Sequence, residues 1–150
     1  MAPSFRFRLE RVRAVRERKE KLAQLELARS ITRLSDSQAG VRSAEAEVES
    51  ARAEQRTVRA EGTVGAAELL AGQAFLERVE AEHRRQRDEL ARSEAEVADR
   101  NQQLATAASE HEALVRLRER RRGEHNRELA RRETIFHDEL ASLRFHRSTA

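Results

Sequence analysis

The chain has 150 residues and a formal net charge of +3, with 38% charged residues against 3% aromatic ones. Because ordinary cores need large apolar and aromatic side chains, this composition excludes a compact globule and leaves disorder or long helices that share a seam. The absence of cysteine excludes disulfides, thiol catalysis and cysteine-based zinc sites. No run of about 18 apolar residues occurs, so we expect no membrane insertion.

The first helix is predicted over about residues 5–60. One stripe of apolar or small residues advances in alternating steps of three and four, as on one helical face. Its members are Leu34, Ser37, Val41, Ala44, Val48, Ala51 and Val58, with Gln55 in the series. A looser stripe precedes it, made of Leu9, Val12, Val15, Leu22, Leu25, Leu27 and Ile31. A helix of this length, about 80 Å, must run along a partner helix.

A connection is predicted at about residues 61–72, in the stretch EGTVGAAELLAG. Gly62 and Gly65 weaken a helix, and Thr63 can cap a new one. Gly72 can divide a short linking helix from the long helix that follows.

The second helix is predicted over about residues 73–143, with a frayed C-terminal tail. Every seventh residue belongs to the series Leu76, His83, Leu90, Val97, Leu104, His111, Arg118 and His125. The companion positions are Val79, Gln86, Ser93, Arg100, Ala107 and Leu114. This is a heptad seam with polar interruptions, and Gly123 should weaken the helix locally.

Two long helices joined by a short connection must pair antiparallel. The predicted fold is therefore all-α, a long antiparallel two-helix coiled-coil hairpin with a short linking helix or turn near residues 62–75. We expect one coiled-coil domain over residues 1–150, in which paired residues have numbers that add up to about 130–136. Alanine and serine in the seam allow close approach but bury little area, so modest stability is expected.

Positive charge is concentrated in two basic segments, residues 1–21 and residues 116–132. Each carries eight Lys and Arg against three Glu. The hairpin brings both segments to its open end, where like charges repel. We therefore expect this end to face an acidic partner.

Catalytic and ligand-binding patterns are absent from the sequence, which predicts no catalytic residues, no cofactor and no metal. His83, His111 and His125 share a heptad phase, but about 42 and 21 Å of helix separate them, too far for one ion. Glutamates interleave with the arginines, and no set of aromatics could stack on bases, so the sequence argues against nucleic acid as the partner. Leu9, Val12 and Val15 are interpreted as part of the seam, not as a membrane-binding face.

A small apolar group lies at the start of the second helix, made of Phe75, Leu76, Val79 and His83. The last three share a face because they are three and four residues apart. Two interpretations stay open: packing against the first helix, or a docking patch.

The sequence resembles the flagellar export protein FliJ family. The resemblance is carried by FRFRLERVRAVRERKE, AAELLAGQAFLERVEAEHRRQ and LVRLRERRRGEHNRELARRETIFHDELA, in this order and spacing. It implies a small, non-enzymatic, cytoplasmic coiled coil similar to the central stalk of rotary ATP synthases. It also implies association with the hexameric flagellar export ATPase FliI and the export gate protein FlhA, at the inner face of the cell membrane, and an escort role beside export chaperones.

The resemblance also implies two sets of contact residues. The ATPase-facing candidates are Phe7, Leu9, Val12, Arg13, Arg16, Arg118, Arg121 and Arg122. The gate-facing candidates are Phe75, Leu76, Val79 and His83. His125 departs from the family pattern, in which an aromatic is expected.

Two other functions stay open at this point. One is a nucleic-acid-associated coiled-coil arm, and the other is the equivalent stalk protein of a virulence-type secretion system.

Overall fold

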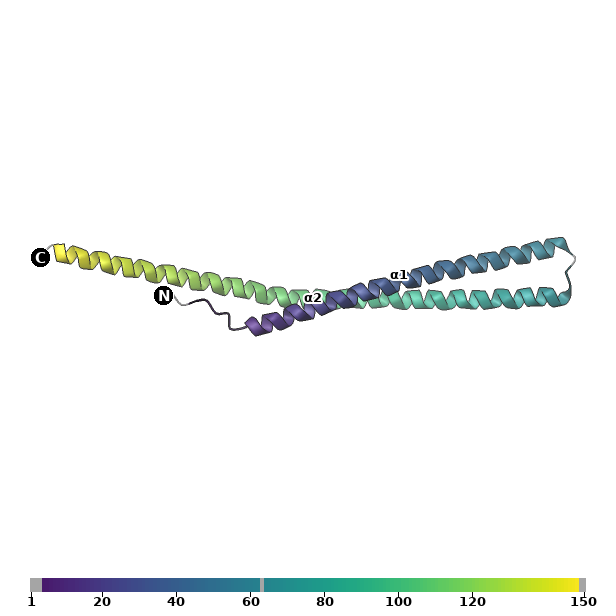
Figure 1. Ribbon diagram of the computed structural model, residues 1–150, viewed down its shortest axis with the longest axis horizontal. Helices are drawn as coiled ribbons and strands as arrows, with labels where there is room; N and C mark the ends of the chain where they lie inside the picture. The colour runs from purple at the N-terminus through teal and green to yellow at the C-terminus, as the bar shows by residue number, and fades with distance from the viewer. Residues whose placement is uncertain (1–3, 63, 149–150) are drawn as a thin grey trace. The chain divides into compact units, whose positions relative to one another are not determined.

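The computed structural model describes residues 4–62 and 64–148, with side chains up to residue 145 (Figure 1). It contains two helices, α1 (Glu10–Glu61) and α2 (Ala66–Ser148), and no strand among these residues. The predicted all-α helical hairpin is thus confirmed. The chain groups into two units: Leu22–Ala105, here the connection unit, and Met1–Lys21 with Thr106–Ala150, here the terminal unit. Each unit is described by itself, and the single domain expected from the sequence stays a prediction.

The first helix begins at Glu10, later than residue 5. The backbone N–H of Glu10 donates to the carbonyl of Phe7 (3.2 Å), and that of Arg13 to the carbonyl of Leu9 (2.9 Å). Phe5 lies outside the helix, with its ring centroid 5.7 Å from that of His125. The segment before Glu10 thus packs on α2 through side chains and does not extend α1.

The connection is shorter than predicted. Gly62 follows the end of α1 with φ +65°, a left-handed conformation that favours glycine and ends helices. α2 then begins at Ala66, and the carbonyl of Gly65 accepts hydrogen bonds from the N–H groups of Glu68 and Leu69. Thr63, the predicted cap, lies outside the described residues.

Gly72 does not interrupt α2, contrary to the sequence-based prediction of a separate linking helix. One glycine costs a helix only about 1 kcal/mol relative to alanine, which the continuous hydrogen-bonded turns on either side outweigh. α2 also continues to Ser148, beyond the predicted end near residue 143.

The connection unit contains the predicted seam. From residue 34 to residue 58, every member of the predicted α1 stripe is buried or half-buried, and Gly40 is the one other position that is not exposed. Val48, Ala51 and Val79 form a buried cluster against which Leu76 packs. This part of the sequence pattern is confirmed.

The looser stripe is corrected by the structure in the same unit. Leu22, Leu25 and Ile31 are exposed, whereas Leu27 is half-buried and Ser30 is buried. Heptad spacing counted back from Leu34 and Ser37 gives Leu27 and Ser30. The seam therefore keeps its register here and passes through small and polar residues, while the larger apolar side chains lie off it.

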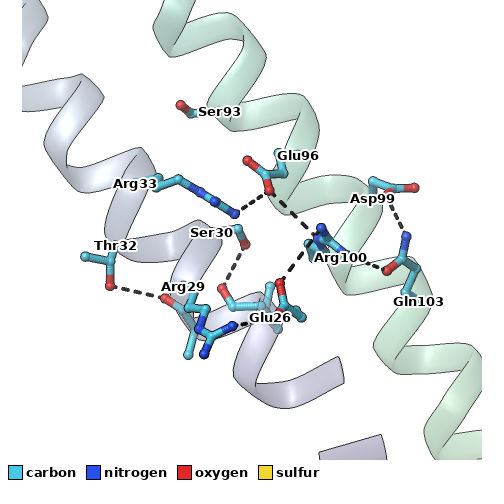
Figure 2. Close-up of polar contacts among 12 residues, drawn as sticks. Glu26, Arg29, Ser30, Thr32, Arg33, Ser93, Glu96, Asp99, Arg100 and Gln103 are labelled. Carbon is cyan, nitrogen blue, oxygen red and sulfur yellow. Dashed lines mark hydrogen bonds and ion pairs between the residues drawn. The ribbon is translucent and has the colours of Figure 1, made fainter. Parts of the chain in front are cut away.

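Polar contacts cross the seam between α1 and α2 in this unit. Ser37 and Ser93 share a hydrogen bond of 2.8 Å between their Oγ atoms. Figure 2 shows the neighbouring layer, in which Arg33 of α1 pairs with Glu96 of α2 and Arg100 reaches Glu26. These contacts fix which residues of the two helices lie opposite each other.

The pairing register is lower than predicted. Hydrogen-bonded and ion-paired residues on the two helices have numbers that add up to between 126 and 132, from Glu26 with Arg100 to Arg52 with Glu80. The sequence predicts about 130–136. The difference follows from the connection, which lies at residues 62–65 and not at 61–72.

A disulfide is expected to form between cysteines placed at Ser37 and Ser93. The two Oγ atoms are 2.8 Å apart, which brings the flanking Cβ atoms within the range that a disulfide bridges. Oxidation of Ser37→Cys with Ser93→Cys should give an intramolecular crosslink, measured by non-reducing gel mobility and peptide mass. The matched pair Ser37→Cys with Arg100→Cys, one heptad away, should not crosslink. Crosslinking only between molecules would contradict the hairpin.

Replacing Gly123 by alanine is expected to stabilise α2 by about 1 kcal/mol. No described atom outside the helix backbone and the adjoining residues lies within 4 Å of the position a Cβ would take. At Gly40, by contrast, an added Cβ would stand 2.5 Å from Oε1 of Gln86. Thermal unfolding followed by circular dichroism should show a clear rise in Tm for Gly123→Ala and a smaller one for Gly40→Ala. The reverse order would contradict this packing.

Candidate partner-binding surfaces

The seam of the terminal unit is charged. Heptad spacing continues through Glu20, Arg16 and Arg13, all at least partly buried. Arg16 donates to Glu110 of α2 at 2.5 Å, and Nδ1 of His111 lies 2.6 Å from Oε2 of Glu20. The seam predicted from Leu9, Val12 and Val15 is therefore wrong, because these three side chains are exposed.

Arg13 lies within a cluster of carboxylates. It donates to Glu10 at 2.7 Å and to Glu17 at 3.2 Å. The hydrogen bond from Arg13 lowers the pKa of Glu10, and the hydrogen bond to Glu10 raises the pKa of Arg13. The pKa of Glu17 is lowered first by the hydrogen bond from Lys21 and then by Arg13. The positive charges of Arg13 and Lys21 are therefore neutralised within the chain.

Acid is expected to weaken the first turns of α1. Because the folded pKa values of Glu10 and Glu17 are lowered, their ion pairs stabilise the fold above the unfolded value near 4.5. This stabilisation is lost as the pH falls through the lower folded values. Glu10→Gln with Glu17→Gln should reduce the loss of helical circular dichroism between about pH 7 and about pH 2.

The control for this titration is Glu45→Gln with Glu47→Gln, since neither carboxylate forms an ion pair with a described residue. The control should titrate like the wild type. Equal acid sensitivity of the Glu10/Glu17 variant and the wild type would contradict the assignment.

The ATPase-facing candidates occupy different environments. Arg13 and Arg16 lie in the seam, Arg118 approaches Glu10 at 3.7 Å, and Arg121 pairs with Glu124 at 3.2 Å. Arg122 is exposed and forms no ion pair within residues 4–62 and 64–145. Phe7, Leu9 and Arg121 line one groove of the terminal unit, between the segment before α1 and α2. The structure thus places three of the ATPase-facing candidates, Phe7, Leu9 and Arg121, in one groove.

Sequence reasoning missed the exposed cations Arg11, Arg18 and Lys19. The heptad count that starts at Leu34 and Ser37 would have found them, because it assigns Arg13, Arg16 and Glu20 to the seam and these three to the outside. Because these heptad positions are occupied by charged residues, a search for apolar residues alone does not find the seam here.

The gate-facing candidates also separate by burial. Val79 is 7% exposed and belongs to the buried cluster, with Leu76 packed against it. His83 is half-buried, whereas Phe75 is 41% exposed, with the guanidinium of Arg78 5.2 Å from its ring centroid. The sequence left packing and docking open as interpretations of this group. In the structure Leu76 and Val79 pack against the first helix, and Phe75 is the side chain exposed for docking.

An apolar groove adjoins Phe75 in the connection unit. Its volume is about 560 Å³, and its lining includes Val58, Leu69, Leu70 and Gly72. Leu69 and Leu70 are exposed. The large apolar side chains available for contact near the connection are therefore Phe75, Leu69 and Leu70.

The described part of the chain offers no metal site and no helix that could span a membrane. No group of three His, Asp or Glu side chains there could hold a metal ion. No helix there is both long and apolar enough to cross a membrane.

Comparison with known proteins assigns the family. The family model described as "Flagellar FliJ protein" matches residues 5–150. The chain belongs to the FliJ family. No curated protein and no solved structure gave a match.

Membership of the FliJ family makes this chain a flagellar export-related protein of a non-enzymatic family. The match covers all three motifs quoted above and includes His125, the position that departs from the expected pattern. Between the functions that the sequence left open, it favours flagellar export over a nucleic-acid-associated arm or a virulence-type stalk.

Proposed function

We propose that this FliJ-family chain is a central-stalk-like component that binds the export ATPase FliI and the export gate protein FlhA. In this role it couples the ATPase to the gate and escorts subunit export at the inner face of the cell membrane, with export chaperones as further partners. The observation that carries the ATPase half is the concentration of positive charge, since both basic segments, each with eight cations against three Glu, belong to the terminal unit. A partner with an acidic opening would attract such a unit.

The gate half of the proposal is supported by the connection unit. Phe75, Leu69 and Leu70 are exposed apolar side chains beside a groove, and exposed aromatic and aliphatic side chains next to concave surface are typical of docking sites. Leu76 and Val79 support this surface from beneath and do not contact the partner.

Deletion of the gene tests the proposed function. The deletion strain should release less hook and filament protein into the medium and swim poorly, and the intact gene should restore both. The matched comparison is complementation with Phe75→Ala, which should restore less export than the wild type while accumulating to the same level. Full export in the deletion strain would contradict the proposal.

A further inference from the structure

The outer face of α1 in the terminal unit is formed by a regular set of exposed residues. Between residues 10 and 20 the exposed positions are Arg11, Val12, Val15, Arg18 and Lys19. Their spacing of i, i+1, i+4, i+7 and i+8 places all five on one face of the helix. This face therefore consists of three cations and two half-exposed valines.

The carboxylates of the same stretch lie elsewhere on the helix and are engaged. Glu10 and Glu17 bind Arg13, and Glu20 contacts His111. Arg11, Arg18 and Lys19 form no hydrogen bond or ion pair with any described residue. Over residues 10–20 the charge of α1 is thus segregated, with neutralised cations inside and uncompensated cations outside.

Several exposed cations elsewhere in the same unit are paired along the helix, although Arg122 and Arg131 are not. In the same unit Arg116 pairs with Glu112, Arg120 with Glu124, and Arg132 with Glu128, each four residues apart. Such pairs stabilise an isolated helix, and the outer face of α1 in the terminal unit contains none of them. Uncompensated cations are complementary to carboxylates supplied by another molecule.

The apolar part of the face favours a protein over a membrane. Val12 and Val15 offer a narrow strip, and interfacial helices usually bury a wider face with bulky side chains such as Trp, Phe and Leu. A strip of two valines between guanidinium and ammonium groups fits a protein surface with carboxylates around a small apolar centre.

We infer that Arg11, Val12, Val15, Arg18 and Lys19 form the surface through which this chain recognises a carboxylate-rich protein surface. Arg13 and Arg16, which are paired within the unit, act on this recognition only by positioning the helix. The inference rests on the proposed function, because it takes the export ATPase as the protein that supplies the acidic surface.

The test compares two charge reversals in the full-length chain. Arg11→Glu with Arg18→Glu changes two exposed cations seven residues apart, and Arg85→Glu with Arg92→Glu makes the same change at the same spacing in the connection unit. Binding to purified FliI should weaken by about tenfold or more for the first variant and by less than about twofold for the second. The wild type should also lose affinity with added salt more steeply than the first variant.

Three outcomes separate the possible failures. Wild-type chain that does not bind FliI overturns the proposed function together with this inference. Wild-type binding that survives the Arg11/Arg18 reversal, or that falls equally in both variants, overturns the inference alone. Binding of the same proteins to phosphatidylglycerol vesicles is measured in parallel. If the Arg11/Arg18 reversal loses binding to the vesicles but still binds FliI, the face binds lipid, and the inference is overturned.

Folding is controlled within the same experiment. Because Arg11 and Arg18 form no hydrogen bond or ion pair with any described residue, their reversal should keep the helical circular dichroism of the wild type. The control reversal breaks two exposed ion pairs, Arg85 with Glu82 and Arg92 with Glu89, and should change the circular dichroism little, because exposed pairs contribute little stability. Arg11→Gln with Arg18→Gln removes the charges without introducing carboxylates and should give a smaller loss of FliI binding in the same direction. Unchanged binding in this neutral variant and in the reversal would contradict the inference.

Discussion

Replacing Glu20 and His111 together by leucine is expected to stabilise the terminal unit. The two side chains face each other across the seam at 2.6 Å, with 23% and 19% exposure, and Nε2 of His111 is buried without a hydrogen-bond partner among the described residues. Apolar replacement of a buried ion pair is often neutral or stabilising, by up to about 4 kcal/mol. Since this pair is partly exposed, we expect roughly 1–2 kcal/mol, measured as a rise in the urea midpoint at constant m value.

The single variants are the controls for this pair. Glu20→Leu and His111→Leu each leave one polar side chain in the seam beside leucine, so each should stabilise less than the double variant, or destabilise. A double variant that is less stable than the wild type would show that the pair contributes net stability, contrary to this account of the charged seam.

Val79→Ala is expected to lower stability, whereas Phe75→Ala is expected to lower the affinity for FlhA. Val79 is 7% exposed and packs with Val48 and Ala51, so its truncation should cost about 2 kcal/mol of unfolding free energy. Phe75 is 41% exposed, so its truncation should change stability by less than about 1 kcal/mol and weaken binding to the FlhA cytoplasmic region by about tenfold. Urea unfolding and a binding titration on the same samples measure both effects.

Each of these two variants is the control for the other. A Val79→Ala chain that stays folded at the assay temperature should still bind FlhA, because its side chain is not available to a partner. Strong loss of stability in Phe75→Ala, with no loss of affinity for FlhA, would assign Phe75 to packing and contradict the proposed gate surface.

How far the sequence predicts this structure depends on what fills the seam. Where Val41, Ala44 and Val48 mark it, the apolar pattern predicts both helix and buried face, and the structure agrees. Toward the N-terminus the seam passes to Arg16 and Glu20, while Val12 and Val15 lie outside it. Apolar residues off the seam there direct a pattern-based interpretation to the wrong face.

The contact sites were predictable only in part, because burial depends on the register between two helices. Arg16 was expected as an exposed cation, but its distance of 2.5 Å from Glu110 depends on where the connection lies. Gly72 suggested a longer connection than the structure has. The resulting error of a few residues in the register between α1 and α2 changes every predicted cross-helix partner. Val79 and Phe75 could not be separated into packing and contact residues for the same reason.

The most direct test of the account is whether this chain bridges the ATPase and the gate. Purified FliI, the cytoplasmic region of FlhA and the full-length chain should be mixed and separated by size-exclusion chromatography with light scattering. We predict that FliI and FlhA elute together only when the chain is present, and that Phe75→Ala and Arg11→Glu with Arg18→Glu each release one of the two partners. Identical elution of FliI and FlhA with and without the chain would contradict the central claim.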